Sequence, residues 1–390
     1  MKTNPIPKEA AVSLTVYDSY AKAKSVLDQH DRAICSISGG KDSDIVLDII
    51  WRLDAERKVK YVWFNTGIEY EATRRHLKEL EDKYQVGIER ARPVKSVPAC
   101  CHEYGQPVIS KLVSETIERA QKYGFKWEDK PIEELQRKYT GRCQSVLRWW
   151  CNDFFNTKAG KFLQWSIGYN KGLKEFIMEN PPDFKVSSKC CTYAKKKAAR
   201  LYEKGADLKI TGIRRAEGGV RSVNYANCFS HDTAIDAYRP LFWYLDKDVK
   251  EYSDAFGIRH SDCYEVYGLK RTGCVGCPYN RRLAEEMRAI ETYEPALAKV
   301  CRHVFKDSYA YTQKYKKFVA ERFIKGSREM LPSRNTTPSG DVIHSGDAIP
   351  PKDATSSGGT TPPEVAASFG GAGAYLAPAD PCASCAGGLL

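Results

Sequence analysis

The chain has 390 residues, 42% apolar and 28% charged, a composition typical of a globular protein that buries a sizeable core. The net charge is +12, which favours an anionic partner such as a nucleotide, a nucleic acid or a small oxyanion. No apolar run approaches the roughly 20 residues that cross a bilayer, and the N-terminus lacks the apolar segment of a secretory signal. We therefore expect a cytoplasmic protein without a membrane partner. Its 14 cysteines are expected to serve metal binding or redox chemistry rather than disulfides.

Helices and short apolar strands alternate through the first 91 residues. Helical spacing of apolar residues predicts helices, and short apolar runs predict buried strands. In chain order we expect a helix over 9–29, a strand over 33–38, a helix over 42–53, a strand over 59–65, a helix over 70–84 and a strand over 86–91. This alternation is typical of a parallel sheet with crossover helices, an α/β fold.

The later chain predicts fewer regular elements. Residues 207–212 are expected to form another strand, and residues 237–241 a loop or short edge strand, because Pro240 cannot donate to a ladder. Residues 281–330 form a predicted basic helical extension of a domain over 1–280. Residues 331–390 hold 9 Gly and 8 Pro without apolar periodicity, so we expect a disordered tail.

A glycine-rich turn joins the first strand to the helix that follows it. Residues 38–43 read Ser-Gly-Gly-Lys-Asp-Ser. Two glycines permit a tight turn that presents backbone amides to an anion, and the helix N-terminus adds a favourable dipole. Lys41 adds a positive charge, and the serines add hydroxyl donors. The alternative is an ordinary glycine turn, but the full string favours phosphate binding.

The string at 38–43 resembles the PP-loop of the adenine nucleotide alpha-hydrolase superfamily, which grips the pyrophosphate of ATP. Residues 64–70 resemble the "DTG" element of the phosphoadenosine phosphosulfate (PAPS) reductase family, with Asn65 in place of Asp. Residues 211–217 resemble that family's G-x-R-x-x-E element, and residues 239–249 its P-L-x-x-W segment. These elements occur in the family's order over about residues 30–285.

The resemblance implies a PP-loop α/β fold and a set of site residues. The nucleotide would be ATP or PAPS, with Mg²⁺. Nucleotide-binding residues would be Ser36, Ser38, Gly39, Gly40, Lys41, Asp42, Ser43, Asn65, Thr66, Gly67, Gly212, Arg214 and Arg221, and catalytic residues Lys41, Asp42, Arg214 and Arg215. Arginine suits this role because its guanidinium makes bidentate contacts with phosphate or sulfate.

Two cysteine pairs lie far apart in the sequence. Cys190 and Cys191 are adjacent, whereas Cys274 and Cys277 form a C-x-x-C motif. Four thiolates suit zinc or an iron–sulfur cluster, and redox thiols without metal are a third possibility. The pattern resembles the [4Fe–4S] site of adenylylsulfate reductases, so we predict that these four residues bind such a cluster, with zinc as the alternative.

The remaining cysteines give weaker signals. Cys100 and Cys101 are either incidental loop residues or a substitute ligand or persulfide-carrying thiol. Cys382 and Cys385 form a C-x-x-C in the tail, where reductases of the family carry a nucleophilic cysteine, but the family's E-C-G-L-H motif is absent.

Basic residues mix with aromatic residues between 311 and 328, a combination that suits single-stranded nucleic acid. The favoured alternative is an amphipathic helix whose aromatic side chains pack on the body.

Three functions are consistent with these features. The first is a PAPS reductase family enzyme, a transferase or oxidoreductase, that cleaves ATP to AMP and pyrophosphate, adenylates a target and acts in sulfur transfer. The resemblance implies DNA or tRNA as possible acceptors, with a sulfur-donor protein or a thioredoxin-like reductant as partner. The second is a PAPS or adenylylsulfate reductase that releases sulfite. The third is a non-catalytic, zinc-stabilised module that binds a nucleotide or nucleic acid.

Removal of the tail tests its predicted disorder. A chain truncated at about residue 330 should melt at the same temperature as the full chain, because residues 331–390 contain no segment able to form a packed face. Differential scanning calorimetry of the two chains measures this directly. A large drop in melting temperature would show that the tail docks on the body.

Overall fold

The computed structural model describes residues 12–139, 141, 143–153, 166–170, 172–218, 225–231 and 234–329, with the backbone alone for 323–329. Six strands form one sheet in the order β3-β2-β1-β4-β6-β5. All neighbours are parallel except the β5–β6 pair, which is antiparallel. The strands are β1 (Ala33–Ser36), β2 (Lys60–Phe64), β3 (Ile88–Ala91), β4 (Leu208–Ile210), β5 (Phe229–Ser230) and β6 (Asp236–Tyr238). The predicted α/β fold with a mostly parallel sheet is confirmed.

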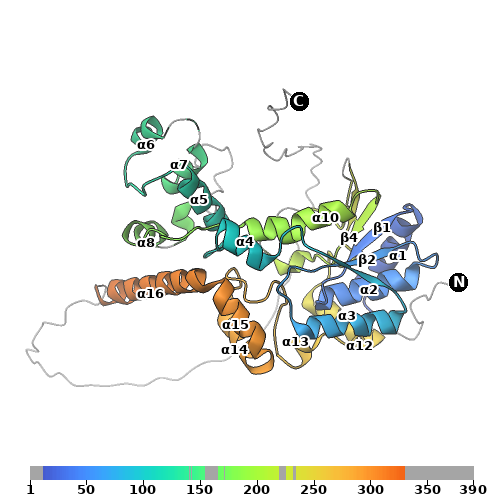
Figure 1. The fold of residues 1–390 in the computed structure, drawn as a ribbon. Coiled ribbons are helices and arrows are strands. Elements are labelled where there is room, and N and C mark those ends of the chain that lie inside the picture. The colour runs from blue at the N-terminus through green and yellow to red at the C-terminus, as the bar shows by residue number, and fades with distance from the viewer. Residues whose placement is uncertain are drawn as a thin grey trace, which may run out of the picture. The chain divides into compact units, whose positions relative to one another are not determined.

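Helices cover both faces of the sheet (Figure 1). The helices α1 (Leu14–Asp28), α2 (Lys41–Leu53), α3 (Glu71–Tyr84) and α12 (Asp246–Phe256) share one hydrophobic core with the sheet. Successive strand residues face opposite sides: Cys35 joins this core, whereas Ile34 joins a smaller cluster beside Tyr202 of α10 (Lys197–Tyr202). Each predicted helix and strand of residues 12–91 is present, within a few residues of its expected bounds.

The edge-strand alternative for residues 237–241 is wrong. Strand β6 lies inside the sheet, between β4 and β5. The objection from Pro240 does not apply, because the strand ends at Tyr238 and the proline follows it. The two-residue β5, which the sequence did not predict, forms the edge instead.

A helical region between β3 and β4 was not predicted in detail. It contains α4 (Val97–Tyr104), α5 (Lys111–Lys122), α6 (Ile132–Lys138), α7 (Gln144–Trp150), α8 (Leu173–Glu179) and α9 (Lys189–Cys191), the last continuing through a π-helical turn (Thr192–Lys196) into α10. Most of it packs around its own hydrophobic cluster, which includes Trp149, Trp150 and Phe176. A single apolar period does not reveal such a cluster, because its residues come from several short helices that are separated by loops.

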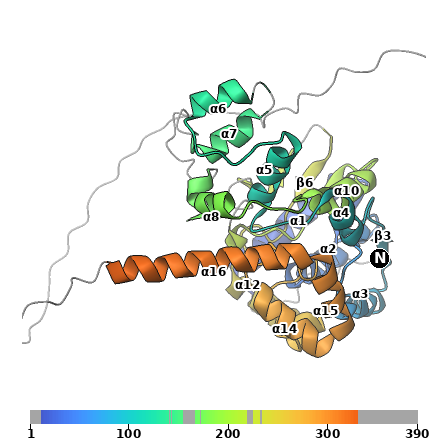
Figure 2. The same ribbon diagram turned by 60° about the vertical axis from the view of Figure 1, so that its left-hand side comes forward.

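The C-terminal part of the described chain is helical, as expected. It contains α13 (Asp262–Glu265), α14 (Leu283–Tyr293), α15 (Pro295–Val304) and α16 (Lys306–Glu329). Figures 1 and 2 both show α8 lying beside α16. The Phe176 ring on α8 lies 5.1 Å from Tyr311, 5.2 Å from Tyr315 and 5.5 Å from Phe318 between centroids. These aromatic residues of α16 therefore pack on the body, as the favoured alternative expected. The domain boundary at residue 280 stays a prediction, and the tail lies outside the described residues.

Truncation of Phe176 tests the contact between α8 and α16. Phe176→Ala should destabilise the protein by about 3–5 kcal/mol, because it leaves a cavity among three rings. Urea unfolding measures the loss. Met178→Ala on the same helix is the control, since Met178 is 41% exposed and should lose far less. Equal losses for the two variants would contradict the central place of Phe176 in this cluster.

Candidate functional site

The turn between β1 and α2 has the backbone that phosphate binding needs. Gly39 has a φ of +68°, a conformation that side chains rarely allow, and a methyl group added there would lie 2.8 Å from Thr73 Cγ2. Gly40 precedes Lys41, the first residue of α2. The turn therefore requires its first glycine for both conformation and space. It follows Ser36 at the carboxyl end of β1, where open α/β sheets bind ligands.

The two serines of this loop fold it on itself. Ser43 Oγ accepts hydrogen bonds from the Gly40 amide at 3.0 Å and the Ser38 amide at 3.2 Å, and it donates to the Gly40 carbonyl at 2.8 Å. Ser38 Oγ lies 3.1 Å from the same hydroxyl. The amides and hydroxyls predicted to hold phosphate thus gather on one side of a single turn.

Lys41 is the cation of the loop. Its Nζ lies 4.9 Å from the centroid of the Tyr264 ring, and no ion pair among the described residues includes it. A cation–π contact is weaker than a hydrogen bond between an ammonium group and phosphate. Lys41 is therefore available to an incoming anion.

Asp42 and Arg214 form an ion pair across the site. Arg214 Nε lies 3.0 Å from Asp42 Oδ1, and its Nη1 donates to Asp246 Oδ1 at 2.9 Å. Burial raises the pKa of Asp42, and Arg214 opposes that increase. The loop after β4 comes close enough for this contact because Gly212 has no side chain: a methyl group there would lie 3.2 Å from the Asp42 carbonyl carbon.

The two arginines predicted to be catalytic, Arg214 and Arg215, make different contacts. Arg214 faces the loop, whereas the Arg215 guanidinium lies 5.5 Å from the ring centroid of the half-exposed Trp243. Nothing in the described contacts joins Arg215 to the phosphate loop. Arg221 lies outside the described residues.

The loop after β2 lies at the same end of the sheet as the loops after β1 and β4. Asn65 Oδ1 accepts from the Gly67 amide at 2.7 Å, so Asn65 closes a local turn. Thr66 donates from both its amide and its hydroxyl to Glu69 Oε1, at 3.0 Å and 2.6 Å. Two residues on, the Ile68 carbonyl accepts from the Val275 amide, next to Cys274, at 3.5 Å. The "NTG" loop at the sheet edge therefore contacts the C-x-x-C segment.

The two distant cysteine pairs are neighbours in space. Cys190 interacts electrostatically with Cys277, and Cys191 with both Cys274 and Cys277. Burial raises the pKa of Cys274, and raises that of Cys277 to about 12. Cys190 and Cys191 come from α9, just before the π-helical turn, and Cys274 and Cys277 come from the loop before α14. No single sequence pattern spans both pairs.

A cation lies within this group of thiols. Lys195 is exposed as a residue, and its ammonium group interacts with Cys274 and Glu69. Removal from water would lower its pKa, and these two acidic groups outweigh that effect and raise it. Glu69 has a raised pKa because of its burial. Lys195 thus places positive charge where thiolates would need compensation.

Cys101 also belongs to this group, and the favoured interpretation of the sequence did not assign it there. A hydrogen bond with Cys101 is the main reason for the raised pKa of Cys190. Cys100 interacts with Cys191, and both Cys100 and Cys101 share a buried cluster with Cys190. The only available signal was the Cys-Cys dipeptide itself. Cys382 and Cys385 lie outside the described residues.

The thiols suit a soft metal by their chemistry. Thiolate ligands select zinc and iron–sulfur clusters. Among the side chains that the structure describes, no three His, Cys, Asp or Glu residues are arranged to hold a metal ion. Assignment of a cluster to Cys190, Cys191, Cys274 and Cys277 therefore stays a prediction, supported by their proximity and by Lys195.

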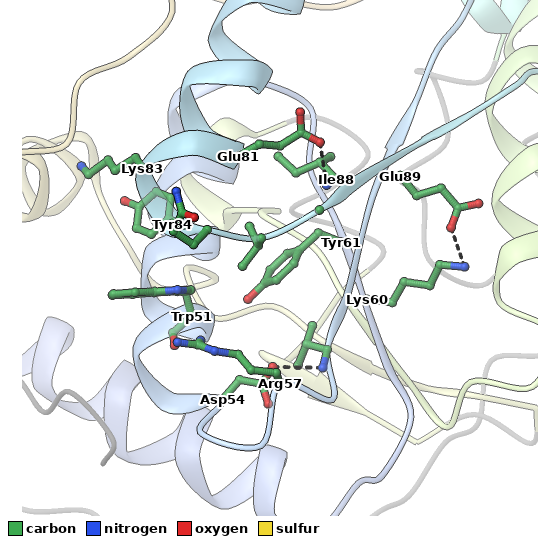
Figure 3. A pocket seen from close by; sticks show the side chains of 14 residues that line it. Trp51, Asp54, Arg57, Lys60, Tyr61, Glu81, Lys83, Tyr84, Ile88 and Glu89 are labelled. Carbon is green, nitrogen blue, oxygen red and sulfur yellow. Dashed lines mark hydrogen bonds and ion pairs between the residues drawn. The ribbon is translucent and has the colours of Figure 1, made fainter. Parts of the chain in front are cut away.

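A hollow of about 740 Å³ lies at the end of the sheet where β2 and β3 begin (Figure 3). Trp51, Tyr61 and Tyr84 line it at the amino ends of β2 and β3. Figure 3 shows the Lys60 ammonium paired with Glu89, 2.6 Å apart. No residue predicted from the sequence as a site residue lines this hollow.

Comparison with known proteins bears on the first part of the chain. Residues 32–140 match the family described as the phosphoadenosine phosphosulfate reductase domain. The matched range includes the phosphate loop and the Asn65–Gly67 loop, and it ends before Cys190. No helix among the described residues is long and apolar enough to span a membrane.

Individual relatives cover different shares of the chain. The adenosine 5'-phosphosulfate reductase of Neisseria meningitidis is 29% identical over 100 residues, which are 26% of this chain and 41% of that protein. The chain therefore matches about two fifths of the length of this curated relative.

Solved structures of low identity also resemble the chain. PAPS reductase from Candida auris, in a phosphate complex, is 14% identical with a TM-score of 0.34, covering 68% of this chain and 96% of that one. The U34-tRNA thiolase NcsA from Methanococcus maripaludis, with its [4Fe-4S] cluster, is 11% identical with a TM-score of 0.32, covering 78% and 80%.

Replacement of Lys41 tests the phosphate loop. Lys41→Ala should weaken binding of ATP or PAPS roughly ten- to hundredfold, because a charged hydrogen bond to phosphate is lost. Isothermal titration calorimetry measures the affinity. Lys78→Ala, on the exposed face of α3, is the control and should bind as the wild type does. Unchanged affinity of Lys41→Ala for both nucleotides would rule out the assignment.

Proposed function

We propose that this protein is an enzyme of sulfur metabolism that binds ATP at its phosphate loop and uses it in sulfur transfer. A nucleophilic oxygen of the target attacks the α-phosphorus, the bond from that phosphorus to the bridging oxygen breaks, and pyrophosphate leaves. The adenylated oxygen is then a better leaving group. A sulfur nucleophile attacks the target atom that bears this oxygen, the bond between that atom and the oxygen breaks, and the oxygen leaves as part of AMP.

One observation carries this proposal: the same two segments of the chain border both the phosphate loop and the cysteine group. Thr66 and Ile68 follow β2 at the carboxyl edge of the sheet, and the Ile68 carbonyl accepts from the amide of Val275, the neighbour of Cys274, at 3.5 Å. Tyr264 contacts Lys41 and bonds to Thr272, two residues before Cys274. A nucleotide on the loop would therefore lie beside the thiols, as coupled nucleotide and sulfur chemistry requires.

The residues around the loop have distinct proposed roles. The amides and hydroxyls of residues 38–43, with Lys41, would hold the phosphates at a helix N-terminus. Asp42 is the proposed Mg²⁺ ligand, and its ion pair with Arg214 would open to release the carboxylate for the metal and the guanidinium for phosphate. Asn65, Gly67 and Gly212 would line the nucleotide from the neighbouring loops.

A metal centre would lie beside the nucleotide. Cys190, Cys191, Cys274 and Cys277 would hold a [4Fe–4S] cluster, which would supply a site that binds or reduces sulfur. Lys195 would offset part of the negative charge of the thiolates and the phosphates.

A reductase of PAPS or adenylylsulfate is the second candidate. The Neisseria meningitidis relative favours it, since that protein is an adenosine 5'-phosphosulfate reductase. A cysteine thiolate would attack the sulfur of the sulfonucleotide and release the nucleotide, and a thioredoxin-like dithiol would then reduce the S-sulfonate and free sulfite.

The acceptor in the first candidate is proposed to be DNA or tRNA. The side chains of Lys314, Lys316 and Lys317 on α16 are exposed and supply positive charge for phosphates. A sulfur-donor protein is the further partner that this reaction needs.

Two assays on anaerobically purified protein separate the candidates. ATP–pyrophosphate exchange that depends on Lys41 supports adenylation, whereas sulfite release from PAPS or adenylylsulfate supports the reductase. Lys41→Ala should lose the exchange, and Lys78→Ala should retain it. Absence of both activities, with nucleotide binding intact, would leave the binding module as the function.

Substitution of the C-x-x-C cysteines tests the metal centre. Cys274→Ser and Cys277→Ser should each lower the iron content and the visible absorbance of the purified protein, because a thiolate ligand is lost. Metal analysis by mass spectrometry measures iron and zinc together. Cys228→Ser is the control, since Cys228 packs against the separate core beneath the sheet. A wild-type protein with one zinc and no iron would contradict the cluster.

A further inference from the structure

A short segment joins the phosphate loop to the C-x-x-C motif. It begins at Tyr264 in α13 and ends at Cys277. The Tyr264 hydroxyl and Thr272 Oγ1 lie 2.8 Å apart and form a hydrogen bond. This bond ties the two parts of the segment together at the point where both reach the phosphate loop.

Both hydroxyls of this pair face the second glycine of the loop. A methyl carbon built on Gly40 would lie 3.1 Å from the Tyr264 oxygen and 3.3 Å from Thr272 Oγ1. The Lys41 ammonium lies over the ring of the same Tyr264. Burial raises the pKa of Tyr264 to about 12, so its hydroxyl stays protonated and able to donate at neutral pH. A phosphate held by Gly40 and Lys41 would meet both hydroxyls.

The far end of the segment is fixed. Val275 is fully buried and its amide points to the Ile68 carbonyl at 3.5 Å. The Gly276 amide donates to Glu286 Oε1 at 3.2 Å, and the Gly276 carbonyl accepts from Tyr309. Cys274 therefore lies between this anchor and Thr272, so a displacement of Thr272 acts on Cys274 through one intervening residue.

We infer that Tyr264 and Thr272 are positioning residues that sense phosphate on the loop and thereby control access to Cys274. One hydroxyl of the pair donates to a bound phosphate group while it accepts from the other, and this contact orders residues 272–274 against the loop and shields the Cys274 thiol. The inference rests on the proposed nucleotide site, and it adds to that site a coupling between nucleotide occupancy and thiol exposure. Neither residue stands out in the sequence, because Tyr264 in α13 and Thr272 in the loop after it lie far along the chain from residues 38–43.

Alkylation of Cys274 tests this coupling in the full chain after a chelator has removed any bound metal, because a cysteine that binds a metal centre is not free to react. Iodoacetamide labelling, followed by peptide mass spectrometry, gives the rate at Cys274 with and without saturating ATP and Mg²⁺. We expect ATP to slow labelling several-fold in the wild type. Tyr264→Phe keeps the ring under Lys41 and removes only the hydroxyl, and Thr272→Val keeps the side-chain shape. Each variant should lose the protection while its ATP affinity falls roughly two- to tenfold, as expected for one hydrogen bond.

The matched control is Tyr267→Phe. The Tyr267 hydroxyl donates to Glu294 Oε1 at 2.9 Å, so this variant removes a hydroxyl three residues away from Tyr264 without touching the pair. It should keep the protection. The double variant Tyr264→Phe/Thr272→Val should show no greater loss than either single variant, because the two hydroxyls act as one unit.

Three results would overturn the inference. Protection that persists in both single variants at saturating ATP would show that the pair does not transmit occupancy. ATP binding without any protection in the wild type would overturn the inference alone, leaving the proposed function intact. Absence of ATP binding in calorimetry would overturn the proposed nucleotide site and this inference together.

Discussion

Strand β1 lies between β2 and β4, and all three run in the same direction. This arrangement brings their carboxyl ends, and the loops that follow them, to one edge of the sheet. The chain continues from β1 to β2 and β3 on one side, whereas β4 and β6 lie on the other, so the loops after β1 and β4 diverge at a topological switch point. The phosphate loop, the Asn65–Gly67 loop and Gly212 meet there for that reason.

Buried polar contacts hold the helix behind the phosphate loop. Asp44 of α2 is fully buried, and its Oδ2 lies 2.9 Å from His260 Nδ1 and 3.1 Å from His76 Nε2. One turn later, Asp48 accepts from the Tyr252 hydroxyl at 2.6 Å and the Tyr84 hydroxyl at 3.0 Å. These contacts tie α2 to α3 and α12, so the N-terminus of α2 is held relative to the sheet. A phosphate site at that N-terminus depends on this rigidity, because its amides must keep a common direction.

The cysteine group depends on the helical region between β3 and β4. That region returns the chain to the sheet through α9 and the π-helical turn, which carry Cys190 and Cys191 beside α4. Extra residues in a helical turn are frequent at functional sites, because they redirect side chains out of the regular spacing. The loop before α14 then brings Cys274 and Cys277 to the same place. The nucleotide edge and the thiols are thus neighbours through long-range packing.

The sequence alone determined the strand–helix alternation of the first 91 residues and predicted a phosphate-binding loop at residues 38–43. Both rest on local physics: apolar periodicity selects each element, and six consecutive residues supply the glycines, the cation and the hydroxyls. Only the tertiary structure decided that Arg214 pairs with Asp42, that Lys41 rests on Tyr264, and that Cys101 lies against Cys190. These contacts join residues about 90 to 220 positions apart, and their geometry follows from how the sheet and its helices pack rather than from any local pattern.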